Sequence, residues 1–349
     1  MPKPKIFISY WFGDRTIPLG AAMADGFREL GFDVFCFNTW IESRLYRHLL
    51  KPASRLARGF GFKNTDFSRN SPWGREQYRQ RMLHEAALRF NPDILLIIHG
   101  HVIDPDIIAD LKRRNPALLT LGWWVENPRD DNRPLLSQVS LYDHYFCIHK
   151  FNYDVGSGIK HLQAVAVDRK RYHRLEPPLL RNLELVFVGS WYPKRETFLA
   201  AIADLPLSIY GPIWGKKCHT PELRKTLKGR AIWGQQLLSL YNRAQIVIDI
   251  PVWDSRRETL NLRALDVPAT GTLLLTEDSA TLRQLLTPGV EVATYKTPDE
   301  LLTQSLHYLA GTEARQRVAN AGYARAQQLG TYADKAEEML TLAGWPMAS

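Results

Sequence analysis

Short apolar runs alternate with helical patterns along almost the whole chain. In the first half, runs rich in β-branched and aromatic residues predict strands at "KIFISYW", "FDVFCF", "DILLIIHG", "LLTLGWW", "HYFCIH" and "LQAVAV". Between them, stretches such as 18–30 and 74–90 have the apolar spacing of amphipathic helices. Near-continuous apolar strands separated by helices are typical of a parallel sheet covered on both faces. The pattern therefore predicts an α/β fold.

The pattern pauses at Pro177–Pro178, which we interpret as a linker because two prolines continue neither a central strand nor a helix interior. A second series of strands is then predicted at "LELVFVGS", "LSIYG", "AIWG", "QIVIDI", "TLLLT" and "EVATY". We expect two doubly wound, Rossmann-like domains facing a central cleft, over residues 1–175 and 176–330. A C-terminal helix over 331–349 is expected to pack back on the first domain.

Charge and cysteine content narrow the class of protein. The chain of 349 residues carries a formal net charge of +9, which favours anionic partners or serves solubility alone. Its 3 cysteines form no CxxC pair, which predicts a reducing compartment without disulfides. No apolar run approaches the roughly 20 residues of a transmembrane helix. We expect a cytoplasmic protein, with peripheral binding to the inner face of the membrane as an option.

Several nucleotide and catalytic fingerprints are absent. No G-x-G-x-x-G follows a strand, and there is neither a G-x-S-x-G nor an H-E-x-x-H motif. Asp104 and Asp106 imitate a metal-binding D-x-D pattern, but with a proline between them they predict a capped helix start. His99 and His101 end a strand without an identifiable third ligand, so we predict no metal site. We take both histidines as candidate acceptor contacts.

Two cations follow the first strand of the second series. In "VFVGSWYPKRETFL", Gly189 and Ser190 end a strand, and Lys194 and Arg195 begin a helix. Cations there oppose the helix dipole, which favours anions at helix N-termini, so an anionic ligand such as a diphosphate is indicated. The alternative is a surface helix whose first turn happens to be basic. Tyr210, at the end of the next strand, joins these four as a donor-binding candidate.

The stretch "ETLNLRALDVPATG" places polar side chains on an otherwise apolar helix. We expect the helix to begin near Leu260, which puts Asn261 and Arg263 close to its free N–H groups. Asp266 lies among core residues, and a buried carboxylate without a partner is costly. Its partner is either a ligand or a nearby base such as Arg263. Glu258 lies eight positions earlier in the chain.

Residues 184–330 resemble the CgeB-like (spore maturation protein-like) glycosyltransferases. That family shows N-x-R-x-F-E-A-x-A-x-G, an apolar strand, an acidic turn, L-x-x-L-F-x-P-G-x-E-V and Y-x-x-P-x-E-L. The corresponding stretches here are "NLRALDVPATG", "TLLLTED", "LRQLLTPGVEV" and "YKTPDEL". "FVGSWYPKRETFL" is similar to the start of the same domain, and "WWVENP" (123–128) more loosely to an aromatic–acidic turn of the N-terminal half.

The resemblance implies the GT-B fold and transfer of a sugar from a nucleotide donor, for which we consider UDP-, GDP- and dTDP-sugars. The lack of a convincing acidic metal site fits a transfer that needs no metal. The segment from Glu258 to Asp266 also resembles the E-x7-E motif of retaining GT-B enzymes. This second resemblance implies that Asp266 holds the donor ribose and that Glu258 lies near the transferred sugar. The family's glutamate is aspartate here, one methylene shorter. A helix N-terminus with Lys194, Arg195 and Arg263 would stabilise the leaving nucleoside diphosphate.

The N-terminal half is expected to hold the acceptor. Asp14, after the first strand, and Glu126 are candidate bases if the enzyme is inverting, although Asp14 is equally suited to cap a helix. A basic stripe adjoins an apolar one over 44–60, and Pro52 is expected to kink or divide the helix. The basic stripe comprises Arg44, Arg47, Lys51, Arg55 and Arg58. It suits an anionic membrane, an anionic acceptor (lipid-linked glycan, nucleic acid or protein) or plain solvent, with Arg44, Arg47 and Lys51 as acceptor candidates.

Two alternatives to a glycosyltransferase remain open at this stage. A sugar-nucleotide epimerase of the GT-B fold needs the same donor site but no acceptor. A surface or assembly protein would keep the fold and bind no donor. Product analysis separates the first alternative from a transferase, and nucleotide binding separates the second.

Overall fold

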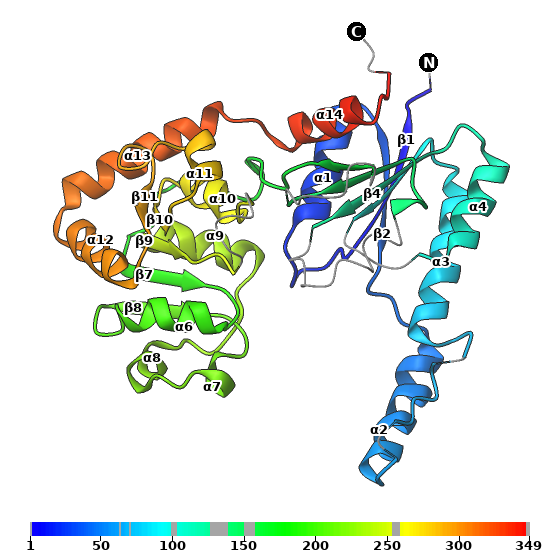
Figure 1. The fold of residues 1–349 in the computed structure, drawn as a ribbon, viewed down its shortest axis with the longest axis horizontal. Helices are drawn as coiled ribbons and strands as arrows, with labels where there is room; N and C mark the ends of the chain where they lie inside the picture. Colours follow the sequence, from blue (N-terminus) through cyan, green and yellow to red (C-terminus); the bar gives the residue numbers. More distant parts are fainter. Residues whose placement is uncertain are drawn as a thin grey trace. The chain divides into compact units, whose positions relative to one another are not determined.

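The computed structural model describes residues 2–62, 64–69, 71–98, 103–125, 139–149, 158–252 and 259–346. The chain divides into two compact units (Figure 1). The N-terminal unit comprises Met1–Ile148, Tyr153–His161 and Ala336–Ser349. The C-terminal unit comprises His149–Asn152 and Leu162–Lys335. Each unit is built around its own parallel sheet, as the alternation of apolar strands and helices predicts.

The N-terminal unit contains a sheet of six strands in the order β2-β1-β3-β4-β5-β6, and every neighbouring pair is parallel. Its central strands carry the near-continuous apolar runs that burial on both faces requires. The strands are β1 (Lys5–Tyr10), β2 (Asp33–Asn38), β3 (Ile94–Ile98), β4 (Leu119–Trp124), β5 (His144–Cys147) and β6 (Ile159–His161).

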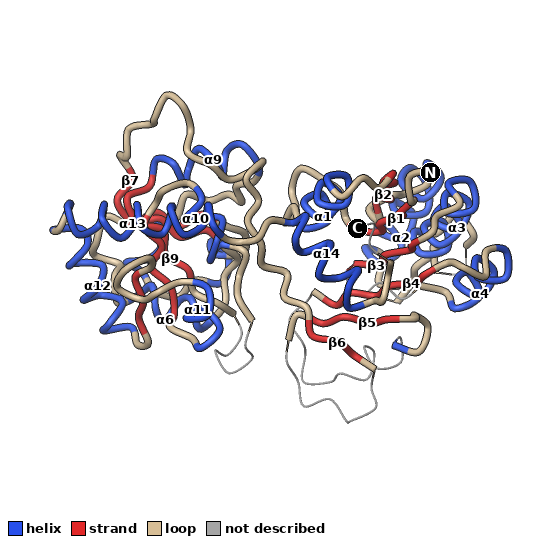
Figure 2. Tube along the Cα trace, turned by 90° about the horizontal axis from the view of Figure 1, so that it is seen from above, coloured by secondary structure: helices blue, strands red, loops and turns tan. Residues whose placement is uncertain are grey.

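Helices cover both faces of this sheet. One face packs on α3 (Arg75–Phe90) and α4 (Pro105–Arg114), with Phe7 and Leu95 in the core between them. Figures 1 and 2 place α1 (Leu19–Glu29) beside the C-terminal part of α14 (Tyr332–Leu342). The predicted start of α4 is confirmed, because the Asp104 carboxylate accepts from the backbone N–H of Asp106 at 3.1 Å.

A helical arm leaves the N-terminal unit after β2. It consists of a π-helical turn, η1 (Tyr46–Leu50), that continues directly into α2 (Lys51–Gly59). The predicted division at Pro52 takes the form of this change of helix type, one residue before the proline. Figure 1 shows α2 extending away from the sheet. The chain returns along the arm, where the Phe67 N–H donates to the Ser54 hydroxyl at 3.1 Å.

The C-terminal unit contains a sheet of five parallel strands in the order β11-β10-β9-β7-β8. The chain enters at β7, passes to β8 on one side and returns to β9 on the other. The strand order therefore reverses between β7 and β9, and ligands of such sheets bind at the carboxyl ends of the strands at this point. The strands are β7 (Leu183–Val188), β8 (Leu207–Tyr210), β9 (Ala244–Asp249), β10 (Leu273–Glu277) and β11 (Ala293–Tyr295).

Two apolar cores lie on opposite faces of this sheet because side chains alternate along each strand. Leu185 and Ile246 belong to one core and Val186 and Val247 to the other. The first core is covered by α6 (Pro193–Ala200), α7 (Trp214–Lys217), α8 (Pro221–Thr226) and α12 (Pro298–Ala310). The second is covered by α9 (Gly234–Arg243), α10 (Arg263–Ala269) and α11 (Ala280–Leu285). The long helix α13 (Thr312–Gln328) contributes to both.

Three predicted elements differ from the structure. Residues 162–167 are buried but form no strand, apart from a bridge of Val167 to Thr331, and the edge strand β6 precedes them. Residues 231–233 are extended without a ladder, because α9 begins at Gly234. The helix expected from Leu260 begins only at Arg263, because the preceding residues turn to meet the end of β9. Apolar composition does not distinguish a strand from a buried connection.

Candidate functional site

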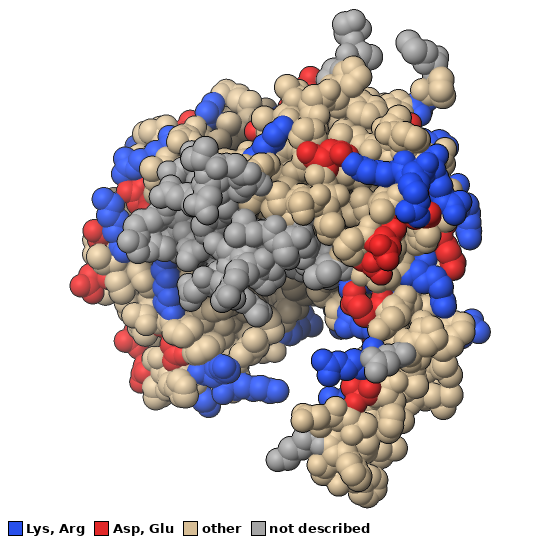
Figure 3. Space-filling view, turned by 45° about the vertical axis from the view of Figure 1, so that its right-hand side comes forward, with Lys and Arg blue, Asp and Glu red and all other residues tan. Residues whose placement is uncertain are grey.

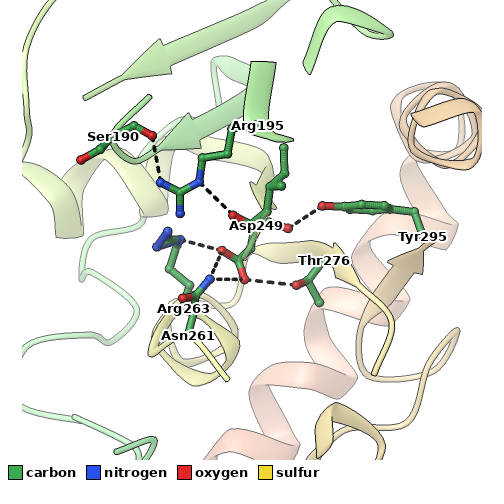
Figure 4. A network of polar contacts seen from close by, with 8 residues as sticks. Ser190, Arg195, Asp249, Asn261, Arg263, Thr276 and Tyr295 are labelled. Atoms are coloured by element: carbon green, nitrogen blue, oxygen red, sulfur yellow. Dashed lines mark hydrogen bonds and ion pairs between the residues drawn. The ribbon is translucent and has the colours of Figure 1, made fainter. Parts of the chain in front are cut away.

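The carboxyl end of β9 is organised around Asp249, which is 2% exposed. Its carboxylate accepts from the Asn261 amide at 2.8 and 3.1 Å and from the Arg263 Nε at 3.0 Å. The Thr276 hydroxyl of β10 donates to it at 3.2 Å (Figure 4). The Tyr295 hydroxyl of β11 donates to its backbone carbonyl at 2.7 Å. Through its carboxylate and its backbone carbonyl, Asp249 thus ties the segment before α10 to the ends of three neighbouring strands.

The Asp249 carboxylate uses one of the hydrogen-bond donors of Arg263. Burial lowers the pKa of its guanidinium, but Asp249, Tyr241 and Asp266 together raise the pKa by more. The sequence left open an ion pair between Arg263 and the buried Asp266. The structure pairs Arg263 with Asp249 instead. Asn261 and Arg263 therefore hold the entry to α10 in place. This positions the first turn of α10 at the carboxyl edge of the sheet.

Arg195 bridges the switch point between β7 and β9. Its Nε donates to the Ile250 carbonyl at 2.9 Å, and its Nη1 donates to the Ser190 carbonyl at 2.9 Å. Gly189 is required beneath it, because a Cβ there would lie 2.9 Å from Nη1 of Arg195. Burial, followed by the charge of Arg263, lowers the pKa of the Arg195 guanidinium to about 10.

The two guanidinium groups lie together with unused donors. Within the described residues, Nη2 of Arg195 and both terminal nitrogens of Arg263 make no hydrogen bond. Figure 4 shows these nitrogens pointing toward one another on the same side of Asp249. Like charges held this close repel, and each guanidinium can donate two parallel N–H bonds to an oxyanion. The arrangement is suited to an anionic ligand.

Lys194 and Glu277 complete the charged edge. The Lys194 Nζ lies 2.5 Å from the Glu277 carboxylate at the end of β10, so this cation already has a protein partner. A small pocket opens beside them over the ends of β9 and β10. Its polar lining comprises Asp249, Thr259, Asn261, Thr276, Glu277 and Ser279.

Asp266 is the exception among the buried acids of this unit. It is 6% exposed in the first turn of α10, and its carboxyl makes no hydrogen bond to the described residues. Burial and then the charge of Asp168 raise its pKa well above the usual range, while Arg263 and Arg171 lower it by less. Asp168 itself is paired with Arg171 at 3.0 Å. The Asp266 carboxyl thus keeps its hydrogen-bonding capacity unspent at the start of a helix.

The remaining donor candidates lie at the ends of β7 and β8. Gly189 and Tyr210 are joined there by a backbone hydrogen bond of 2.8 Å, and Tyr210 packs against the core formed by α9 and α10. Ser190 contributes its carbonyl to Arg195. The structure therefore brings Gly189, Ser190, Arg195, Asn261 and Arg263 to one edge of one sheet.

The structure describes only some of the candidate base and acceptor residues of the N-terminal unit. Asp14 is exposed in the turn after β1 and does not cap α1, whose N-cap is Pro18 without a side-chain bond. Arg44 is exposed, while Arg47 and Lys51 reach Glu42 at 3.8 and 3.1 Å. His99, His101, Glu126 and Glu258 lie outside the described residues.

The described residues form neither a metal-binding cluster nor a membrane-spanning helix. Among the residues that the structure describes, no group of three or more His, Cys, Asp or Glu side chains is arranged to hold a metal ion. No described helix is both long and apolar enough to cross a bilayer.

The two parallel-sheet units together have the GT-B fold of nucleotide-sugar glycosyltransferases. The family model described as "Glycosyl transferase-like" matches residues 194–341, which cover α6 to α14. That part of the chain is therefore similar to glycosyltransferase domains. No curated protein sequence matches the chain.

Solved structures share the fold over nearly the full length. Sucrose-phosphate synthase from Thermosynechococcus elongatus superposes with a TM-score of 0.65 at 13% identity, covering 97% of this chain and 98% of that chain. HepE of Anabaena, in complex with UDP and glucose, gives a TM-score of 0.63 at 10% identity over 98% and 99%. A glycosyltransferase from Rickettsia africae gives 0.62 at 11% identity over 98% of each chain. At such identities the likeness shows the fold alone.

Proposed function

We propose that the protein is a glycosyltransferase that moves a sugar from a nucleoside diphosphate donor to an acceptor. The observation that carries this proposal is the pair of guanidinium groups at the β7–β9 switch point, Arg195 and Arg263, with unused N–H donors turned toward one another. A diphosphate offers the negative charge and the oxygen acceptors that such a pair lacks. The glycosyltransferase-like domain at residues 194–341 supports the same reading.

In this proposal the guanidinium pair stabilises the leaving nucleoside diphosphate. Negative charge develops on the phosphate when the bond to the sugar breaks, and preorganised donors stabilise that charge without reorganising. Two guanidinium groups can supply this charge by themselves, so we propose that the transfer does not depend on a metal ion. Lys194 becomes a third donor if a ligand competes for it with Glu277.

The nucleoside is proposed to lie toward Asp266. Its carboxyl is buried, unpaired among the described residues and placed in the first turn of α10. Ribose hydroxyls would satisfy it, as the family resemblance implies. Gly189, Ser190 and Tyr210 lie at the same edge and would contact the donor. UDP is the first nucleotide to test, because HepE of Anabaena was solved with UDP, and GDP and dTDP follow.

Glu258 is proposed to lie beside the transferred sugar, with a retaining outcome, as the E-x7-E pattern implies. Asp14 or Glu126 would be the base if the outcome is inverting. The acceptor is proposed to be anionic and to contact the N-terminal unit near His99, His101 and the basic residues Arg44, Arg47 and Lys51. A lipid-linked glycan, a nucleic acid and a protein all meet that description.

Product analysis tests this function. The full chain is incubated with UDP-, GDP-, dTDP- and CMP-sugars, and release of the nucleotide with transfer of the sugar to water as the acceptor is followed by mass spectrometry. We expect release from one donor class above the rate without enzyme, and much less release with Arg195→Ala. Formation of an epimer with the nucleotide still attached would make the protein an epimerase. Absence of both release and epimer would overturn the proposal.

A further inference from the structure

The helical arm of the N-terminal unit exposes an unusual amount of apolar surface. Leu49 is 60% exposed, Leu56 64%, Phe60 81% and Phe62 66%. Leu49 lies in η1 and Leu56 in α2, and Phe60 and Phe62 follow directly after the end of α2. Contiguous exposed apolar patches of this kind on soluble proteins mark interaction sites. Figure 3 shows the arm as a projection at the bottom of the view, largely without charged side chains at its end.

The outgoing helix of the arm carries charges of one sign only. Residues 44–62 contain five Lys or Arg residues and no Asp or Glu, and the next acid along the chain is Asp66. Lys51 is tied to Glu42 at 3.1 Å near the base of the arm. Toward the tip, Arg55 and Arg58 are exposed, and the Arg58 Nε donates to the Ser54 carbonyl at 3.0 Å. The outgoing helix therefore presents an apolar edge flanked by positive charge, and toward its tip Arg58 lies near an acid, Asp66 of the returning chain.

The arm is anchored to a defined scaffold. The Ser43 hydroxyl donates to the Trp73 carbonyl at 2.8 Å where the arm leaves and rejoins the unit. Farther along, the Ser54 hydroxyl donates to the Leu50 carbonyl at 2.7 Å and accepts from Phe67 at 3.1 Å. These bonds hold the outgoing helix against the returning chain. The apolar edge is thus presented in a fixed orientation.

We propose that this arm docks on an anionic lipid bilayer, with Phe60 and Phe62 entering the boundary between headgroups and acyl chains. A helix over residues 46–59 is about 21 Å long at 1.5 Å per residue, too short to span a bilayer but suited to lie on it. Basic side chains beside the apolar edge match the negative surface of the bilayer. The proposal does not depend on the donor chemistry of the C-terminal unit.

A bilayer fits this surface better than other partners do. A second copy of the arm would bring like charges together, because residues 44–62 contain five Lys or Arg residues and no Asp or Glu. Sites for single-stranded nucleic acid combine basic and aromatic groups for stacking, and the aliphatic Leu49 and Leu56 offer no ring for a base. The boundary of a bilayer accepts apolar and cationic groups side by side.

Vesicle co-sedimentation of the full chain tests the proposal. Vesicles of phosphatidylcholine alone are compared with vesicles containing about one third phosphatidylglycerol, at low and high salt. We expect binding to the anionic vesicles that is weakened by salt, and little binding to phosphatidylcholine alone. Absence of binding to the anionic vesicles would overturn the proposal.

Paired variants separate the apolar and charged contributions. Phe60→Ser with Phe62→Ser is expected to reduce partitioning by roughly tenfold or more, because each phenylalanine buries an apolar ring in the bilayer. The matched control is Leu180→Ser with Val290→Ser, two exposed positions of the C-terminal unit, at 80% and 55%, that should leave partitioning unchanged. Arg55→Glu with Arg58→Glu is expected to cost about tenfold or more and to reduce the salt dependence, whereas Arg230→Glu should change neither.

Other occupants give distinct results. Equal binding by the phenylalanine variant and its control would overturn the apolar insertion. A dimer in light scattering that disappears with Phe60→Ser and Phe62→Ser, without vesicle binding, would assign the arm to a second copy of the chain. Binding of single-stranded DNA that competes with the vesicles and is lost in the arginine variant would assign it to nucleic acid. Circular dichroism of each variant confirms that the fold is retained.

Discussion

Two buried acids lie in the same unit, on either side of the segment that enters α10, and they differ in almost every other respect. Asp249 is 2% exposed and accepts hydrogen bonds from Asn261, Arg263 and Thr276. Asp266 is 6% exposed and receives none from the described residues. A satisfied carboxylate stabilises the fold, whereas an unsatisfied one costs free energy that a ligand can recover. The comparison places Asp249 in the scaffold, and Asp266 is the residue that we propose binds the ligand.

The two arginines that face each other each combine nitrogens that bond to described residues with nitrogens that do not. Arg195 spends two of its nitrogens on backbone carbonyls, and Arg263 spends one on Asp249. The donors left over are turned to the same side, where no described residue meets them. A site prepared for an anion requires that the protein itself not neutralise the charge completely. Backbone carbonyls hold Arg195 and the Asp249 carboxylate holds Arg263, and the remaining N–H donors of both stay available.

The largest expected effect is on stability, from Asp249→Ala. Removing the carboxylate leaves a buried guanidinium, an amide and a hydroxyl without their acceptor, so the free energy of unfolding should fall by about 3–5 kcal/mol. Asp249→Asn retains an acceptor oxygen and should cost less. Urea denaturation followed by circular dichroism measures both. Equal stability of Asp249→Ala and the wild type would remove Asp249 from the scaffold.

The next effect is on turnover, from Arg195→Ala. If this guanidinium stabilises the leaving diphosphate, the rate of nucleotide release should fall by about 10²–10³-fold, the usual loss of one preorganised donor. Acceptor affinity should change much less. Because Arg195 also bridges Ser190 and Ile250, the unfolding curve of the variant is the necessary control. An equal loss in turnover and acceptor affinity would argue against the leaving-group role.

A smaller effect is expected on donor affinity, from Asp266→Ala. Loss of the carboxyl as a hydrogen-bond partner for the ribose should weaken nucleotide binding by about 1–3 kcal/mol. The loss should be similar for a nucleoside without phosphates, which distinguishes Asp266 from Arg195. Calorimetric titration provides both affinities. Unchanged nucleoside affinity in a folded variant would refute the ribose assignment.

The smallest effect is on the pH dependence of stability. Because burial and Asp168 raise the folded pKa of Asp266 above its unfolded value, the folded protein binds this proton more tightly. The resulting stabilisation is fully present below the unfolded pKa and is lost as the pH rises through the folded pKa. Asp266→Asn should therefore gain stability relative to the wild type as the pH rises, by about 1 kcal/mol. Unfolding curves of both proteins from about pH 5 to 8 measure this difference. If the Asp266 carboxyl has a partner, the difference in unfolding free energy between the two proteins would not change with pH.

The sequence predicts the fold well because apolar periodicity and turn residues act locally. The strand that ends just before Gly189, the helix starting at Pro105 and the two parallel sheets all follow from such local patterns. The buried connection at 162–167 was misassigned, since an apolar run of that length has the same composition whether or not it pairs. The start of α10 was placed too early for a different reason. Hydrogen bonds to Asp249, twelve positions before Asn261, decide where that helix begins.

The candidate site is only half visible in the sequence. Gly189 and Arg195 were found because a glycine at a strand end and a misplaced cation are local signals. Asp249 was missed because "IVIDI" is typical of a buried strand, and nothing nearby in sequence shows that its acid is the hub. An acid that closes an apolar strand, followed by N-x-R, is the signal that would have found it. The sequence correctly indicates that Asp266 is a buried acid. It does not show that Arg263 pairs with Asp249 and not with Asp266, because that pairing depends on the three-dimensional fold.

Calorimetric titration of matched nucleotides and nucleosides tests the central claim most directly. UDP, GDP, dTDP and CMP are each titrated beside their nucleosides into the wild type, Arg195→Ala and the control Leu180→Ser. The account predicts that one nucleoside diphosphate binds the wild type and the control more tightly than its nucleoside does. It also predicts that Arg195→Ala loses most of that difference while retaining the nucleoside affinity. Binding of no nucleotide, or equal preference in Arg195→Ala and the wild type, would contradict a diphosphate site at the β7–β9 edge.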